Sequence, residues 1–353
     1  MRKNVQGAFD CLRLFAAISV LFSHSYALVG QDANEPLIRL TNGGTAIREI
    51  AVYAFFAISG YLVTQSWMRD PSVTRFMARR VLRIVPALAL VIVASFAIFG
   101  PLATTLTLSD YFLSRQAWTY LSKILIYPTQ YELPGAFEDN PFPSVVNGSL
   151  WTLRLEFALY IAVAFFGYFG FLRWRWVNVA LAVTCLIMGG LLTQTGLLNS
   201  VPFPHQSIAL FLNSAPFFVG AVLAQSNLDS KLMQGGTAML ALSTVLLILT
   251  PEFKSLLILA LPLAVILIAR YGKCDLTRFG DYSYGIYLFA FPVQQSVIHF
   301  IPSIQPIQLS IVAGIATFIF AFLSWHLIEK PALALKPRRK EIAIPAVFKT
   351  DKS

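Results

Sequence analysis

Two polar residues in a largely apolar stretch are the first candidates for chemistry in this sequence. Arg13 and His24 both fall within Phe9–Ser25, FDCLRLFAAISVLFSHS. Because they are eleven positions apart, an α-helix turning about 100° per residue places them on one face, roughly 16 Å apart along its axis. The spacing predicts a helix face with a fixed cation near one membrane surface and an imidazole deep inside.

Each of these residues alone has an ordinary structural explanation. The Arg13 guanidinium would extend to the membrane surface, and the His24 ring would bond to a neighbouring helix. An ionisable side chain in hydrocarbon nevertheless costs a few kcal/mol and usually faces a bundle interior or a water-filled cavity. Since both residues share one face, we favour a functional site.

The composition is that of a polytopic membrane protein. Of 353 residues, 57% are hydrophobic and 12% are charged, which is about half the charged share of a soluble domain. Ten apolar segments are near the length that spans hydrocarbon: 11–30, 48–67, 82–100, 150–171, 176–196, 207–226, 235–250, 255–270, 283–300 and 307–328. We predict an all-α bundle of about ten transmembrane helices, with one membrane domain over residues 1–335 and a basic tail over residues 336–353.

Basic residues are distributed unevenly between the predicted spans. If the N-terminus is cytoplasmic, twenty basic residues fall in cytoplasmic segments and five in outer segments, which is the asymmetry that the positive-inside rule describes. We therefore predict a multi-pass protein of the cytoplasmic (inner) membrane with both termini in the cytoplasm. This distribution also accounts for most of the net charge of +10 without a nucleic-acid partner.

The three cysteines, Cys11, Cys185 and Cys274, lie far apart in the sequence and form no CxxC spacing. They predict neither a disulfide framework nor a metal site.

A long outer region, Pro101–Ser149, separates the third and fourth spans. Its middle, SDYFLSRQAWTYLSKILIY, is too polar for an eleventh span, and we predict a helix lying in the outer interface. A Pro-rich loop over 127–143 follows it. A connection of this length is usually functional or disordered, and here it would form part of a lid over an outward-facing site.

Four arginines follow the second span in RDPSVTRFMARRVLRIVP. Arg75, Arg79, Arg80 and Arg83 fall on adjacent turns of one helical surface. They would anchor the topology or bind anionic lipid. Alternatively, they would clamp phosphate, since guanidinium groups bind phosphate oxygens bidentately.

Further polar residues lie within the spans. Arg154 and Glu156 in SLWTLRLEFALY do not face one another on a single helix, so their partners lie on other helices. Ser59 and Gly60 in AFFAISGYLV allow close helix packing. The ninth span begins GDYSYGIYLF and is rich in hydroxyl groups, including that of Tyr284.

These motifs together carry a resemblance to a known family. The R-x10-H of the first span, FFAISGYL, RRVLRIVP, SLWTLRLEFALY, SYGIYLF and the terminal EKP resemble, in order, the motifs of the membrane acyltransferase 3 family of O-acyltransferases. The chain departs from the family at Ala290, where His is frequent, and at Thr152, where Ser is frequent. The resemblance implies transfer of an acyl group, often acetyl, from cytoplasmic acyl-CoA to a hydroxyl of a carbohydrate or other cell-envelope acceptor, with Arg13 and His24 essential.

The residues suggest how such a transfer would proceed. Coenzyme A has its phosphates at one end and its thioester at the far end of a long arm. We expect the phosphates to bind Arg79, Arg80 and Arg83. Arg13 would steer the arm, and neutral His24 would take the proton of the acceptor hydroxyl. We expect Glu156 to orient the His24 ring at similar depth.

We also expect Ser59, Arg154 and Tyr284 to line the substrate path, and one cavity, narrowest near His24, to be reachable from both faces. The predicted partners are acyl-CoA, a carbohydrate or glycolipid acceptor and membrane lipids, with no metal. A route through an acyl-enzyme is the mechanistic alternative. A transporter or flippase for an envelope glycan or lipid is the functional alternative, in which the intramembrane charges would line a pathway. A non-catalytic scaffold would leave those charges unexplained.

Overall fold

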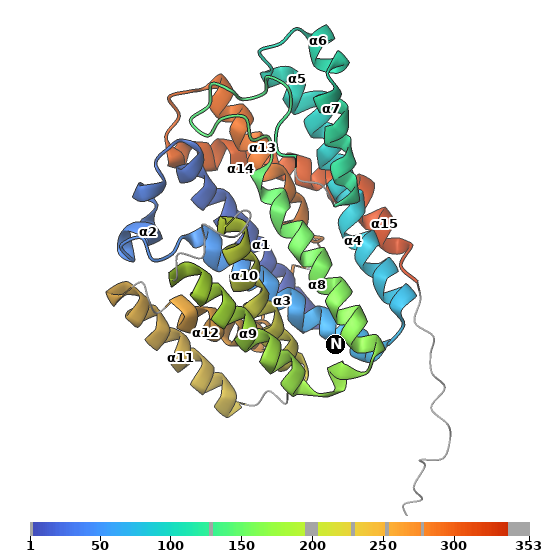
Figure 1. The fold of residues 1–353 in the computed structure, drawn as a ribbon, viewed down its shortest axis with the longest axis vertical. Helices are drawn as coiled ribbons and strands as arrows, with labels where there is room; N and C mark the ends of the chain where they lie inside the picture. Colours follow the sequence, from blue (N-terminus) through green and yellow to red (C-terminus); the bar gives the residue numbers. More distant parts are fainter. Residues whose placement is uncertain are drawn as a thin grey trace, which may run out of the picture.

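The computed structural model describes residues 3–126, 130–194, 204–226, 230–250, 254–276 and 279–337. Ten helices of 18 or more residues cross this described part of the chain (Figure 1): α1 Lys3–Leu28, α3 Ile47–Arg69, α4 Val73–Ala94, α8 Trp151–Tyr168, α9 Arg175–Gln194, α10 Pro204–Ala224, α11 Ser230–Leu249, α12 Lys254–Tyr271, α13 Ser283–Phe300 and α14 Pro306–Ser324. Each overlaps one of the ten predicted apolar segments.

Among the described residues, seven helices are long and apolar enough to cross a membrane, and shorter apolar helices cover Ile208–Ala224 and Ala238–Leu249. The prediction of an all-α, multi-pass membrane bundle is confirmed. Two of the helices are extended by π-helical turns. α4 continues through Ser95–Phe99 into α5, Gly100–Ala103, and α14 continues through Trp325–Glu329 into α15, Lys330–Ala334.

The bundle has two distinct ends. We name the end where α3 finishes and α4 begins, which carries Arg75–Arg83, the arginine end. The opposite end carries α2, Pro36–Leu40, and the segment 104–147, and we name it the loop end. In Figure 1 the N-terminus and the beginning of α4 lie at the bottom, and α5 to α7 lie at the top.

The loop-end segment contains two short helices, α6 Leu108–Leu113 and α7 Arg115–Tyr120, instead of the single interfacial helix predicted. A break at Ser114 accounts for the difference, because its side chain caps α7 by accepting a bond from the Gln116 amide at 3.2 Å. Leu113, Trp118 and Leu125 leave apolar side chains exposed, as an element at a membrane interface would.

Polar side chains fasten this segment to α13. The Asn140 amide donates to the Gln295 backbone carbonyl at 2.9 Å, and the Gln295 amide donates to the Phe142 carbonyl at 2.8 Å. The Asn147 amide donates to the Leu288 carbonyl at 2.9 Å. The predicted Pro-rich loop lies within this segment, although residues 127–129 are outside the described part, as are residues 338–353 of the predicted tail.

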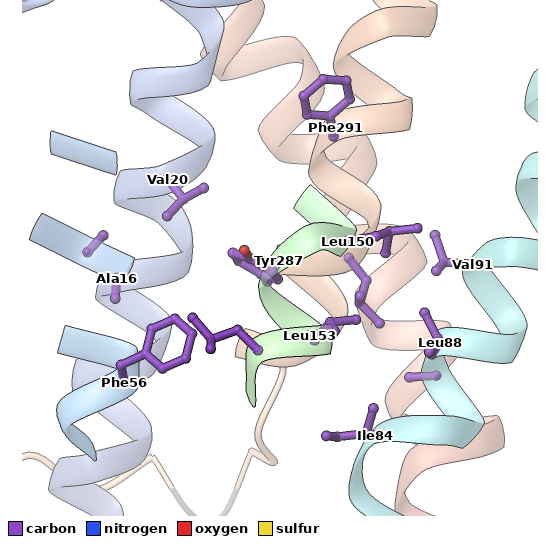
Figure 2. Packing of buried hydrophobic residues seen from close by; sticks show 14 of the residues in the cluster. Ala16, Val20, Phe56, Ile84, Leu88, Val91, Leu150, Leu153, Tyr287 and Phe291 are labelled. Carbon is purple, nitrogen blue, oxygen red and sulfur yellow. The ribbon is translucent and has the colours of Figure 1, made fainter. Parts of the chain in front are cut away.

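The core lies where α1, α3, α4, α8 and α13 meet. Figure 2 shows Ala16 and Val20 of α1 facing Tyr287 of α13, with Leu153 of α8 on the other side of that ring. A close approach joins α3 to α10. A β-carbon added at Gly60 would lie 1.9 Å from the Phe217 carbonyl oxygen, so the predicted packing role of Gly60 is confirmed.

One sequence-based prediction about the cysteines is wrong. Cys11 and Cys274 form a disulfide with their α-carbons 6.4 Å apart, whereas the sequence predicts none. They are 263 positions apart and meet only because α12 packs beside α1. The spacing of cysteines in the sequence does not reveal such a tertiary contact. Cys185 is free and buried in α9.

Candidate functional site

An inner cavity of about 120 Å³ lies between α1, α3, α4, α8 and α13. Phe55, Phe56 and Leu62 form much of its apolar wall. Six of the predicted site residues line it together: Arg13, Ser59, Arg80, Arg83, Glu156 and Tyr284. The tertiary structure therefore brings polar residues from five helices to one cavity.

Asp281 joins two arginines at the arginine end of this cavity. One of its carboxylate oxygens lies 2.5 Å from an Arg83 guanidinium nitrogen and 3.5 Å from one of Arg13. Arg13 also pairs with Asp10 at 3.0 Å. Burial alone would raise the pKa of the Asp281 carboxyl, but the charges of Arg83 and Arg13 outweigh burial and hold that pKa below its ordinary value. The carboxylate therefore stays ionised and fixes both guanidinium groups.

The arginine cluster divides into two groups. Arg79 donates to Asp70 at 2.7 Å, beside the pair of Arg75 with the same carboxylate. These bonds, led by those of Arg75, hold the pKa of Asp70 below its ordinary value. Arg80 instead lines the inner cavity, with its guanidinium carbon 5.6 Å from the centre of the Tyr160 ring. The predicted clamp of Arg79, Arg80 and Arg83 thus lacks Arg79, because Asp70 binds it away from the cavity lining.

Glu156 belongs to the inner cavity alone. Its carboxylate accepts hydrogen bonds from Ser59, at 3.2 Å, and from Tyr160. Within the described residues, no hydrogen bond joins Glu156 to His24, so the predicted orienting contact is wrong. Two residues that lie at similar depth on different helices need not face each other.

His24 lines a second, outer cavity of about 380 Å³ toward the loop end. Its ring meets the Phe291 ring edge to face, with centroids 5.6 Å apart. No described side chain bonds to the imidazole nitrogens. Other polar lining residues come from α3, the turn Gly148–Leu150, α8, α10 and α12: Arg48, Glu49, Ser149, Trp151, Asn213 and Lys254.

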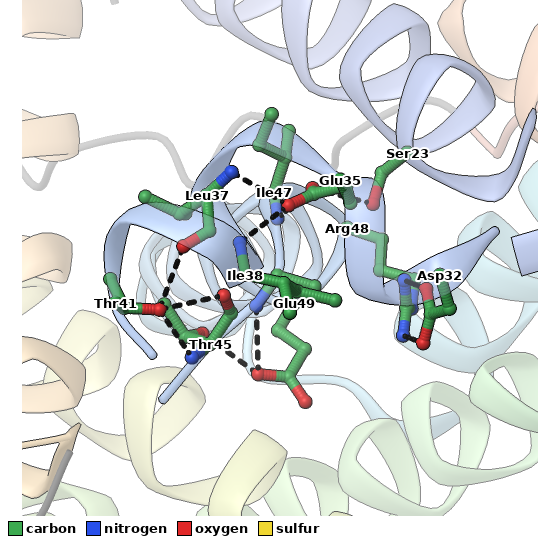
Figure 3. Close-up of polar contacts among 11 residues, drawn as sticks. Ser23, Asp32, Glu35, Leu37, Ile38, Thr41, Thr45, Ile47, Arg48 and Glu49 are labelled. Carbon is green, nitrogen blue, oxygen red and sulfur yellow. Dashed lines mark hydrogen bonds and ion pairs between the residues drawn. The ribbon is translucent and has the colours of Figure 1, made fainter. Parts of the chain in front are cut away.

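A network of polar contacts builds the wall of the outer cavity (Figure 3). Glu35 is fully buried and accepts four hydrogen bonds of 2.7–2.9 Å, from the Ser23 hydroxyl and the amides of Leu37, Ile38 and Ile47. This fixes the start of α3, where Arg48 pairs with Asp32 at 2.7 Å and Glu49 pairs with Lys254 at 2.6 Å. Ion pairs therefore hold the charged side chains that line the outer cavity, namely Arg48, Glu49 and Lys254.

The two cavities meet inside the bundle. Val52, Thr152 and Tyr287 line both of them. The hydroxyl groups of Thr152 and Tyr287 lie 2.6 Å apart at this boundary. Two adjoining cavities thus stand where one was predicted, and the residues that they share include Tyr287 and Thr152 and not His24.

Arg154 lies away from this path. It faces a small cavity of about 10 Å³ that Lys123, Tyr131 and Leu88 also line. Burial, followed by the Arg154 charge, lowers the pKa of Lys123 to about 7. Arg154 lines neither of the two larger cavities, and its predicted role in substrate binding stays a prediction. Its place on α8 turns it toward α4 and the loop-end segment.

Two residues of the site escaped the sequence analysis. Asp281 precedes the ninth span in GDYS, and its position beside a helix N-terminus was the available signal. Tyr287 was one hydroxyl among several in SYGIYLF, and nothing in the sequence indicates that it lies at a boundary between cavities.

The fold and the joined cavities define a multi-pass membrane protein with a polar site enclosed by its helices. A family model described as an acyltransferase domain matches residues 6–326. The chain therefore belongs to the membrane acyltransferase 3 family, as its motifs predict, and it is an acyltransferase.

Two relatives align over nearly the whole chain. The O-acetyl transferase of Shigella phage Sf6 is 31% identical over 342 residues, which cover 91% of this chain and 94% of the relative. Nodulation protein 10 of Rhizobium leguminosarum bv. viciae is 28% identical over 362 residues, which cover 93% of each chain. No solved structure matches the chain.

Proposed function

We propose that this protein takes an acetyl group from acyl-CoA at the arginine end and transfers it to a hydroxyl of a cell-envelope or exported carbohydrate at the loop end. The observation that carries the proposal is the meeting of two cavities of different chemistry at one boundary inside the bundle. The name of the phage relative, O-acetyl transferase, supports acetyl as the group and oxygen as the acceptor atom.

The inner cavity suits the donor. Arg80 and Arg83 offer guanidinium groups to phosphate oxygens, which they bind as bidentate, charge-assisted donors. The apolar wall of Phe55, Phe56 and Leu62 suits the thin arm that carries the thioester. Asp281 holds Arg13 and Arg83 in position before the donor binds, so little side-chain ordering is left for the binding step.

We place the arginine end in the cytoplasm, and the excess of basic residues at that end supports this orientation. Acyl-CoA is made in the cytoplasm and does not cross a bilayer. The donor would therefore bind from the cytoplasmic side, and the acceptor from the outer side of the inner membrane, with both chain termini cytoplasmic.

The outer cavity suits a sugar. Trp151 offers an aromatic face, and the side-chain amide oxygen of Asn213 is buried without a hydrogen-bond partner among the described residues. A sugar hydroxyl would satisfy that oxygen, which is otherwise left at a cost of about 1–3 kcal/mol. The cavity volume, about 380 Å³, falls within the usual range of small-ligand sites.

His24 acts as the general base in this account. Its ring faces the outer cavity and makes no side-chain hydrogen bond within the described residues, so a ring nitrogen remains to accept the proton of the acceptor hydroxyl. The acceptor oxygen attacks the thioester carbon, the carbon–sulfur bond breaks, and the proton passes from His24 to the leaving thiolate. The products are the ester and free coenzyme A.

The direct test measures free thiol. Purified protein in detergent is given acetyl-CoA with and without a carbohydrate extract of the envelope, and thiol release is followed by a chromogenic disulfide reagent. We expect release that depends on the acceptor. The absence of acceptor-dependent thiol release, together with movement of labelled glycan across a proteoliposome membrane, would favour the transporter alternative.

A further inference from the structure

Within the described part of the chain, the boundary between the two cavities contains only two polar side chains. Of the described residues, Val52, Thr152 and Tyr287 line both cavities, and Val52 has no group that forms hydrogen bonds. The other polar residues of the inner cavity, such as Glu156, do not line the outer one, and His24 does not line the inner one. A thioester that is to meet an acceptor beside His24 must therefore pass these two hydroxyl groups.

The hydrogen-bond geometry indicates where the two protons lie. Thr152 Oγ1 is 3.1 Å from the Ser149 carbonyl oxygen, a local contact in the first turn of α8. If Thr152 donates to that carbonyl, the Tyr287 proton occupies the shorter bond, at 2.6 Å, to Thr152 Oγ1. The Tyr287 hydroxyl also lies 3.3 Å from the same carbonyl. If Tyr287 donates to that carbonyl instead, Thr152 can donate to the Tyr287 oxygen. In both arrangements the phenol proton lies at the boundary between the two cavities.

The Tyr287 ring is fixed by its neighbours. It is 9% exposed, and its edge contacts the Phe55 ring with centroids 5.6 Å apart. Figure 2 shows it between α1 and α8, at the centre of the packed core. A rigid ring with a proton at its tip is a preorganised donor, and such donors stabilise charge that develops in a transition state.

We propose that the Tyr287 hydroxyl donates the hydrogen bond that stabilises the oxyanion of acyl transfer, and that Thr152 is the residue that positions it. This inference rests on the proposed acyltransferase function and adds the group that stabilises the negative charge. Tyr287 is a catalytic residue in this account because it touches the reacting oxygen.

The acceptor oxygen forms a bond to the thioester carbon while His24 takes its proton. The carbonyl π electrons move to the carbonyl oxygen, which becomes an oxyanion and accepts the Tyr287 hydrogen bond in place of Thr152. When the carbonyl reforms, the carbon–sulfur bond breaks, and the thiolate receives the proton from His24. Tyr287 keeps its proton throughout and is ready for the next cycle.

The test replaces the hydroxyl and keeps the ring. For Tyr287→Phe we expect kcat to fall by about 100- to 1000-fold, as removal of one oxyanion donor does elsewhere, with the KM values for acetyl-CoA and acceptor within about twofold. Calorimetric binding of coenzyme A should not change. The matched control is Tyr61→Phe, because Tyr61 is buried in α3 and lines neither cavity; it should retain wild-type kcat.

Thr152 gives an independent readout. Thr152→Val keeps the shape but removes the acceptor of the Tyr287 proton, so kcat should fall by less than in Tyr287→Phe. Thr152→Ser should restore it. This pair of variants also carries the test if Tyr287→Phe fails to fold, as judged by thermal melting in detergent.

Several results would overturn the inference. A kcat within threefold of wild type in Tyr287→Phe, in protein that binds coenzyme A normally, would do so while leaving the acyltransferase function intact. Faster acceptor-independent thioester hydrolysis without loss of transfer would show that the two hydroxyls act only as a barrier. If wild-type protein releases no thiol from acetyl-CoA under any condition, the proposed function itself fails, and this inference fails with it.

Discussion

Lys123 is the residue whose replacement gives the most quantitative prediction. Its side chain is 6% exposed, and its ammonium nitrogen has no hydrogen-bond partner among the described residues. It lies 4.2 Å from the centre of the Tyr131 ring and close to the charge of Arg154. Burial and that charge lower the pKa from its ordinary value of 10.5 to about 7. A lowering of this size means that burial disfavours the charged form of Lys123, relative to the neutral form, by about 5 kcal/mol.

The sign of the pH dependence follows from proton binding. Between about pH 7 and pH 10.5 the unfolded chain holds a proton on Lys123 that the folded protein has lost. The free energy of unfolding contributed by this group therefore rises with pH through that window, and it is lowest below about pH 7. Lys123→Met removes the cost of burying the charged amine or of deprotonating it on folding. The variant should therefore be more stable than wild type at pH 7 by up to about 5 kcal/mol. This advantage should shrink toward pH 10.5.

The assay is thermal melting in detergent at several pH values between 6 and 10. The matched control is Lys273→Met, because Lys273 is exposed and its replacement should leave the melting temperature unchanged at every pH. A Lys123→Met variant that is destabilised throughout, or whose advantage does not change with pH, would refute the reasoning. Such a result would mean that the lysine is charged and satisfied in the folded protein.

Three further variants test the site and the packing. His24→Ala should abolish transfer while expression and membrane insertion stay normal, since alanine inserts more easily than histidine; near-normal acylation of the acceptor would remove His24 from the mechanism. Arg83→Gln should weaken coenzyme A binding in calorimetry by about 10- to 100-fold, the value of one charged hydrogen bond, whereas Arg79→Gln should bind normally; equal effects would contradict the division of the cluster. Gly60→Ala should lower stability by about 1–3 kcal/mol, because its β-carbon would meet the Phe217 carbonyl oxygen, and a wild-type melting temperature would show that α3 and α10 separate freely.

The sequence predicted the helices well because hydropathy is a local property. Each of the ten apolar segments corresponds to one long helix, and α1 covers both Arg13 and His24. Arg13 lines the inner cavity and His24 lines the outer one, so the two residues of this helix face adjoining cavities.

The contacts between helices were not predictable in the same way. Helical spacing fixes which residues share a face, but not the rotation of that helix against its neighbours. Glu156 was therefore assigned to His24, although its carboxylate bonds to Ser59 and Tyr160. The pairing of Asp281 with Arg83 joins positions 198 apart, and the Cys11–Cys274 bond joins positions 263 apart. Such pairs depend on tertiary structure that no single-segment pattern contains.

The most direct measurement of the central claim is transfer across a sealed membrane. Vesicles that carry the protein in one orientation are given radiolabelled acetyl-CoA on one side and a carbohydrate acceptor on the other. We expect labelled acceptor when acetyl-CoA is on the side of the arginine end and the acceptor is on the side of the loop end, and none when the two are exchanged. Labelling that requires donor and acceptor on the same side would contradict this expectation.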